Sequence, residues 1–188
     1  MLYFQPEHIE ILSKAVVMAE DILTDAFSLT HEYWKKNPFE VKTLKDVDYR
    51  GEIQGIFAHL AKYGTRLEDK KSGGQAYCLY RIVLIDPEIL KATGGNMQIL
   101  TPFFLYIITH ELLHILRFSF FKCGIFQEDK TQEEAHVHAL TNELLMPVKL
   151  ARMGEVIDFF KGKQRLNPNI KEVKKCQFMN ISANPAVS

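Results

Sequence analysis

The chain has few cysteines and no segment of strongly biased composition. Its three cysteines, Cys78, Cys123 and Cys176, are odd in number and far apart, and no C-x-x-C pair occurs. This spacing implies neither a disulfide framework nor a zinc ribbon and favours reduced thiols, so we expect a cytoplasmic protein. The first residues, Met1 to Pro6, carry no basic stretch followed by an apolar core, so we expect no signal peptide.

The chain also lacks an excess of either charge. It has 23 Lys and Arg and 23 Asp and Glu, which gives a formal net charge of zero. Without a basic excess, we expect no direct nucleic-acid binding. The segment from Lys149 to Cys176 is locally basic, with eight basic residues against three acids. We therefore predict a single domain over residues 1–162 and a basic C-terminal tail over 163–188.

The spacing of apolar residues predicts a mostly helical domain. We expect a helical part over 1–64 and a second part over 65–160 that contains a strand and two long helices. The strand signal is QAYCLYRIVLI at 75–85, which follows a turn at 69–74. The expected helices cover 6–35, 49–63, 88–92, 101–122, 131–146 and 148–160. The predicted fold class is α+β, with a small sheet packed on the helix at 101–122.

The apolar run at 102–121 is long enough to raise the question of a membrane span. It contains His110, Glu111, His114 and Arg117, which are costly in lipid, and no second apolar span occurs. We therefore expect a buried core helix and no membrane association. A membrane-embedded metalloprotease is the alternative.

Residues 110–114 of this run read H-E-L-L-H. On a helix, His110 and His114 lie one turn apart on the same face, where two imidazoles can supply two of the three protein ligands of a catalytic zinc. Glu111, beside the first ligand, can take a proton from a metal-bound water. Apolar helices seldom bury two His and a Glu without a use for them. The motif therefore predicts a zinc site with Glu111 as general base.

A third protein ligand is needed, and the extended form H-E-x-x-H-x-x-G-x-x-H is absent. The helix at 131–146 would return antiparallel to the first, with Glu134 on its inward row and Glu133 about a quarter-turn away. We predict Glu134 as the third ligand; a capping role opposite Thr131 is the alternative for this residue. Other candidate ligands stay open: Glu128, Asp129, Glu133, His136 and His138.

The same helix carries a further signature, E-A-H-V-H-A at 134–139 and E-L-L-M-P at 143–147. It resembles the second motif of the ImmA/IrrE-type metallopeptidases, gluzincins in which a glutamate on a second helix completes the zinc site. The resemblance covers roughly residues 76–150. It implies a zincin-like domain with zinc on three residues and Glu111 as general base; the implied ligands are His110, His114 and Glu134.

This chain departs from the family pattern at three positions. Leu113, His136 and His138 stand where a small residue, an amide and an aromatic residue are usual. His138 lies one turn after Glu134, so we expect it to support a ligand, to replace one, or to face the oxyanion formed in hydrolysis. Other candidate oxyanion donors are His136, Tyr77 and Tyr80.

We therefore expect a zinc-dependent metallopeptidase that hydrolyses a peptide or protein substrate. An extended peptide could add to the strand at 75–85 if that strand is a sheet edge. The resemblance implies intracellular regulatory proteolysis, often of a DNA-binding regulator. The alternative is a non-catalytic metal-binding module for protein interaction, related to toxins or antitoxins.

Overall fold

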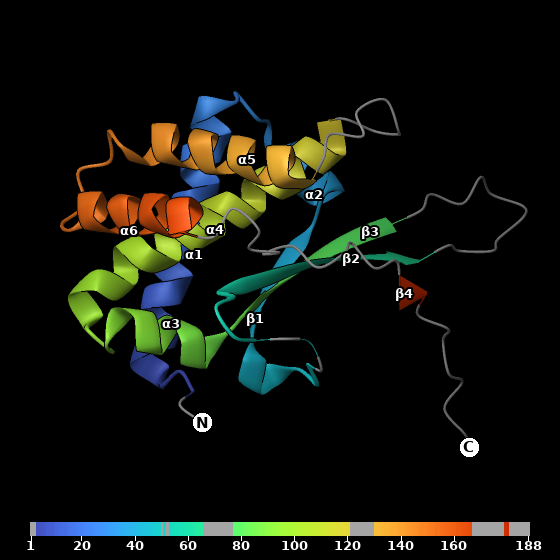
Figure 1. The fold of residues 1–188 in the computed structure, drawn as a ribbon. Helices are drawn as coiled ribbons and strands as arrows, with labels where there is room; N and C mark the ends of the chain where they lie inside the picture. Colours follow the sequence, from blue (N-terminus) through green and yellow to red (C-terminus); the bar gives the residue numbers. More distant parts are fainter. Residues whose placement is uncertain are drawn as a thin grey trace, which may run out of the picture.

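The computed structural model describes residues 3–49, 51, 53–65, 77–120, 130–166 and 179–180. It shows a mostly helical α+β fold, which confirms the predicted fold class (Figure 1). The helices are α1 (Pro6–Ala26), α2 (His31–Lys36), α3 (Asp86–Thr93), α4 (Met97–Phe120), α5 (Lys130–Leu145), α6 (Met153–Leu166) and a short 3₁₀ helix, η1 (Leu44–Asp46). The strands are β1 (Phe39–Thr43), β2 (Ala58–Thr65), β3 (Tyr77–Leu84) and β4 (Met179–Asn180).

The strands form one mixed sheet in the order β1-β3-β2-β4. β1 pairs with β3 in parallel and β2 pairs with β3 antiparallel, so that Ile82 of β3 lies opposite both Val41 and Leu60. The expectation that residues 75–85 form a sheet edge is therefore wrong. β4 pairs with β2 only at Tyr63 and Gly64, so the first residues of β2 have no strand on their outer side within the described part of the chain.

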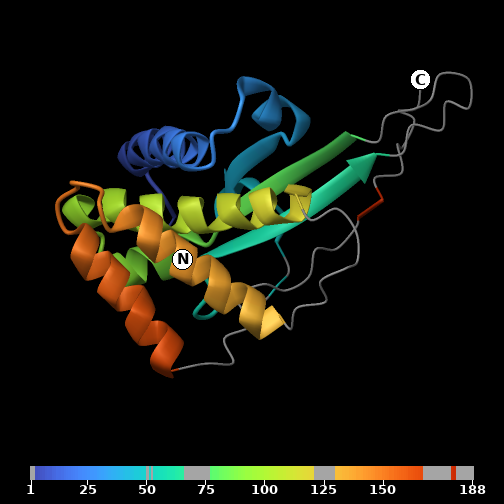
Figure 2. The same ribbon diagram turned by 90° about the horizontal axis from the view of Figure 1, so that it is seen from above.

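Helix α4 forms the centre of the core, which explains the long apolar run. Every residue from Pro102 to Leu116 is buried. α1 packs on one side of α4 and α5 and α6 pack on the other, while β2 and α3 also contact it (Figure 2). A helix covered on all sides can be apolar all round. Among the described residues α4 alone is long and apolar enough to cross a membrane, but 89% of its most apolar window is buried inside the fold, as in a core helix.

The helix predicted at 49–63 is wrong. Its described residues before Ala58 are irregular, and β2 begins at Ala58. Gly55 has a φ of 75°, a left-handed conformation that interrupts a helix. The apolar residues from Ile56 to Ala61 are buried on both faces of the chain, so their spacing matched a helix as well as a strand.

The N-terminal part differs from the prediction in a second way. The helix expected over 6–35 is split into α1 and α2, and Ser28 between them has a φ of 49°. Strand β1, which the sequence did not predict, follows directly after Pro38. The part at 1–64 is therefore not all helical, because it also contributes two strands to the sheet.

The later helices follow the predictions with shifted ends. α4 begins at Met97, four residues before the predicted start, and the Gln98 N–H donates to Asn96 Oδ1 at its N-terminus at 2.9 Å. α5 lies within one residue of the prediction, and α6 begins five residues later than predicted. The predicted turn at 69–74, Cys123, Cys176 and all of the predicted tail except 163–166 and 179–180 lie outside the described residues.

Candidate metal centre

The middle of α4 directs two imidazoles toward the same point. Because His110 and His114 are four residues apart, their side chains leave the helix on one face. Their Nε2 atoms lie 3.2 Å apart, and both side chains are buried. Glu111 is also buried and lines the same small cavity as His110. The structure therefore places the polar residues of the H-E-x-x-H motif inside the fold.

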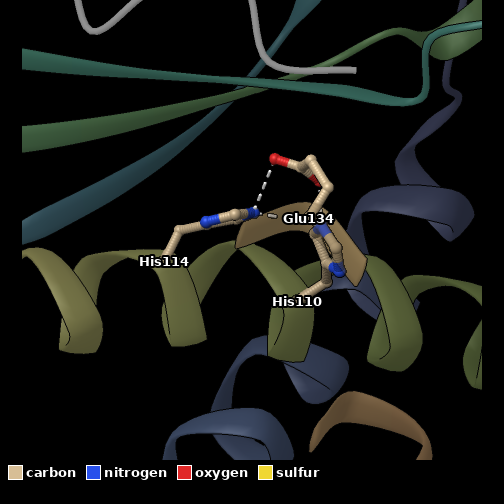
Figure 3. A group of neighbouring side chains, drawn as sticks. All are labelled: His110, His114 and Glu134. Atoms are coloured by element: carbon tan, nitrogen blue, oxygen red, sulfur yellow. Dashed lines mark hydrogen bonds and ion pairs between the residues drawn. The ribbon is translucent and has the colours of Figure 1, made fainter. Parts of the chain in front are cut away.

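Glu134 reaches the two histidines from α5. Its Oε1 lies 3.2 Å from Nε2 of His114, and its Oε2 lies 3.4 Å from Nε2 of His110 (Figure 3). Val137 and Leu145 on the same helix are fully buried and help to fix the face that α5 turns toward α4. Within the described residues, His110, His114 and Glu134 form the one group of potential metal ligands, with ligand atoms within 4.8 Å of one another.

This set of donors fits zinc. Four tetrahedral ligands at about 2.0–2.1 Å from zinc lie about 3.3–3.4 Å from one another. The two Nε2 atoms are 3.2 Å apart, and Glu134 approaches them with different oxygens, Oε2 at 3.4 Å from His110 and Oε1 at 3.2 Å from His114. Two His and one Glu also form a recurring ligand set of catalytic zinc. The ligand role of the three residues stays a prediction.

The two histidines have different electrostatic surroundings. Burial, together with the neighbouring His138 and His114, lowers the pKa of His110 to about 4, despite contacts with Glu134. Burial also opposes a charge on His114, but contacts with Glu133 and Glu134 and the charge of Glu111 outweigh it and raise the pKa of His114 to about 10. Burial of Glu134 is likewise outweighed by both histidines, which hold its pKa well below the usual range. A carboxylate and a neutral imidazole are therefore ready to bind metal, and His114 must lose a proton to do so.

Glu133 takes part in a different interaction from its neighbour. Both of its oxygens accept hydrogen bonds from Arg117 of α4, from Nε at 2.7 Å and from Nη2 at 2.6 Å. Oε1 also lies 3.8 Å from Nδ1 of His114, on the far side of the ring from the cluster. The structure therefore separates the two adjacent glutamates: Glu134 faces the Nε2 atoms and Glu133 faces the outer nitrogen of His114.

His138 is buried next to His110 and belongs to a chain of hydrogen bonds. Its ring centroid is 4.3 Å from that of His110, and its Nδ1 is 3.1 Å from the hydroxyl of Tyr106. The same hydroxyl donates to Oδ1 of Asn142 at 3.2 Å. A cavity of about 20 Å³, room for one water, lies beside these groups. Its lining is aromatic or aliphatic apart from the polar groups of the site: Phe57, Ala58, Tyr106, Ile107, His110, Glu111, His138 and Phe160.

The other sequence candidates do not join the cluster. His136 is exposed on α5, and Tyr80 is buried in the sheet with Lys62 Nζ 5.3 Å from its ring centre. Leu113 is fully buried in the core. The placements of Glu128, Asp129 and the Tyr77 side chain lie outside the described residues.

Among the described residues, three near the site were not predicted from the sequence: Tyr106, Arg117 and Asn142. Tyr106 could have been found, because it precedes His110 by four residues and so lies on the same face of α4. Arg117 follows His114 by three residues and gives a weaker signal of the same kind. Asn142 is one turn after His138 on α5, but this spacing does not predict its hydrogen bond with Tyr106 on α4.

Comparisons of the chain with protein-family models, with curated proteins and with solved structures find no match. The resemblance to ImmA/IrrE-type metallopeptidases therefore stays a prediction.

Proposed function

We propose that this chain is a zinc-dependent metallopeptidase. The observation that carries the proposal is the convergence of His110, His114 and Glu134 at separations of 3.2–3.4 Å, with Glu111 beside a cavity that has room for one water. The two histidines and Glu134 would hold the metal. When bound, zinc supplies a Lewis acid and lowers the pKa of a coordinated water to about 7.

Each neighbouring residue has a chemical task in this proposal. Glu111 accepts a proton from the attacking water and later donates it to the leaving amine. His138 lies next to the cavity and, with both of its ring nitrogens protonated, would stabilise negative charge that develops on the carbonyl oxygen of the substrate. Tyr106 and Asn142 fix the orientation of the His138 ring through the hydrogen-bonded chain.

The substrate in this proposal is an extended segment of a peptide or protein. Ala58, the first residue of β2, lines the cavity beside His110 and Glu111, and the outer side of β2 near it has no strand partner among the described residues. A peptide added there as a further strand would pass the metal ligands. We extend the proposal to regulatory proteolysis in the cytoplasm, with a DNA-binding regulator as the target, on the basis of the family resemblance and the scarcity of cysteine.

Glu111→Gln tests the peptidase proposal. The substitution keeps the size of the side chain but removes the base, so the purified variant should retain stoichiometric zinc and lose about 10²- to 10⁴-fold in hydrolysis of a fluorescence-quenched peptide library. The matched control is Glu143→Gln, the same chemical change at an exposed position of α5, which should leave both unchanged. A wild-type chain without zinc, or a Glu111→Gln variant as active as wild type, would overturn the proposal.

A second candidate is a non-catalytic metal-binding module for protein interaction, of the toxin or antitoxin kind. The small size of the cavity favours it, because about 20 Å³ is room for one water beside His110 and Glu111. This function predicts stoichiometric zinc in the wild type, no hydrolysis of any peptide, and a cellular phenotype that Glu111→Gln leaves unchanged.

A further inference from the structure

Two adjacent carboxylates on α5 have separate surroundings. Glu134 faces the Nε2 atoms of His110 and His114, whereas Glu133 accepts two hydrogen bonds, of 2.6 and 2.7 Å, from the guanidinium of Arg117. The side chains of Arg117 and Glu133 are only 14% and 20% exposed. Paired, planar contacts of this kind hold a carboxylate in one orientation, because both of its oxygens are engaged at once.

The held carboxylate points at the remaining nitrogen of a predicted zinc ligand. Nδ1 of His114 is buried and has no hydrogen-bond partner within the described part of the chain. Oε1 of Glu133 lies 3.8 Å from it, beyond hydrogen-bond distance but within reach of an ion pair. The His114 ring therefore has Glu134 on its Nε2 side and Glu133 on its Nδ1 side.

We propose that Glu133, held in place by Arg117, is a positioning residue that orients the imidazole of His114 toward a bound metal. A carboxylate that accepts the Nδ1–H of a ligating histidine fixes its tautomer, leaves the Nε2 lone pair for the metal, and makes the imidazole more basic. The inference rests on the metal site of the proposed function, but not on peptide hydrolysis.

A purely structural role is the competing explanation. Arg117 belongs to α4 and Glu133 to α5, so their ion pair also ties the two helices together. The two roles differ in what a substitution changes. A helix tie contributes to the stability of the chain whether or not metal is present, whereas a positioning residue changes metal affinity and the spectrum of the bound metal.

The test is a comparison of zinc affinity, measured by competition with a chromophoric chelator, in four variants of the full chain. Glu133→Gln should bind zinc about 10- to 100-fold more weakly than wild type. Arg117→Met should weaken binding in the same direction, and it should add no further loss when combined with Glu133→Gln, because it acts through that carboxylate. Glu143→Gln on the exposed side of α5 is the control and should bind like wild type.

Cobalt substitution gives a second readout. If Glu133 sets the orientation of His114, the visible absorption bands of cobalt in Glu133→Gln should shift in wavelength or intensity relative to wild type and Glu143→Gln. Unchanged zinc affinity together with an unchanged cobalt spectrum in Glu133→Gln would overturn the inference and leave the peptidase proposal standing. A wild-type chain that binds neither metal would overturn both, and zinc binding without hydrolysis would overturn only the peptidase proposal.

Discussion

Replacing Glu134 by Gln should remove most of the stabilisation that zinc gives to the fold. The substitution keeps the side-chain volume and removes the charge that lies 3.2–3.4 Å from the Nε2 atoms of His110 and His114. An amide oxygen is a poorer zinc ligand than a carboxylate, so two ligands of the three would remain. The effect is expected on zinc binding first and on unfolding temperature as a consequence.

The size of the effect follows from mass action. At a free zinc concentration of 100 times the dissociation constant, binding stabilises the folded state by about 2.7 kcal/mol. For a chain of 188 residues this raises the unfolding temperature by about 5–11 °C, at about 2–4 °C per kcal/mol. If loss of the ligand weakens zinc binding 100-fold, the same free zinc concentration equals the dissociation constant of the variant. The stabilisation then falls to about 0.4 kcal/mol and the shift to about 1–2 °C.

The assay is calorimetric or fluorescence-detected unfolding with buffered free zinc, with a chelator reference for each variant. Each zinc-dependent shift is taken within one variant, because Glu134→Gln also removes the partner of a charged His114 and lowers the stability of the metal-free chain. Glu143→Gln controls for the loss of a carboxylate from α5. The assignment of Glu134 as a ligand would be refuted if zinc raised the unfolding temperature of Glu134→Gln as much as that of wild type and of Glu143→Gln.

Three further predictions concern the fold. Asp86→Ala should cost about 2–4 kcal/mol in urea unfolding, since the fully buried carboxylate accepts the N–H groups of Phe4 and Leu44; a loss below about 0.5 kcal/mol would contradict this. Burial lowers the pKa of His59 in the folded chain, so the unfolded chain binds a proton on this ring more tightly, and stability is lost as pH falls below about 6.5. His59→Gln should therefore make the free energy of unfolding less dependent on pH below about 6.5, and wild-type and variant curves that run parallel would argue against this role. Ile108→Ala, at a fully buried position of α4, should cost about 2–5 kcal/mol, and an unchanged midpoint would show that α4 is not the centre of the core.

The parts of the site that the sequence predicts are those set by helical periodicity. The spacing of His110 and His114 places both on one face of a helix wherever that helix lies. The inward row of α5 likewise identified Glu134 from the apolar residues that follow it, and the structure brings this carboxylate to the two histidines. Both arguments use only residues within a few turns of one another.

The parts that could not be predicted depend on contacts between distant segments. β2 was predicted as a helix because the consecutive residues Leu60 and Ala61 are both buried, although they lie on opposite faces of the strand, so its apolar residues do not alternate with polar ones. β1 is only five residues long, and its partner β3 lies about 40 positions later in the sequence. The pairing of Glu133 with Arg117 depends on how α5 lies across α4, which neither helix specifies alone.

The central position of α4 has a consequence for synthesis of the protein. α1 ends at Ala26 and packs on α4, which ends at Phe120. After α1 has been synthesised, the ribosome must therefore add 94 further residues before all of α4 is available to pack against it. At about 5–20 residues per second, this takes about 5–20 s. During that interval Leu12, Ala15, Ala19 and Leu23, all buried in the finished fold, have no α4 to pack against. The nascent N-terminal half is therefore expected to be a substrate for chaperones on the ribosome until α4 has emerged.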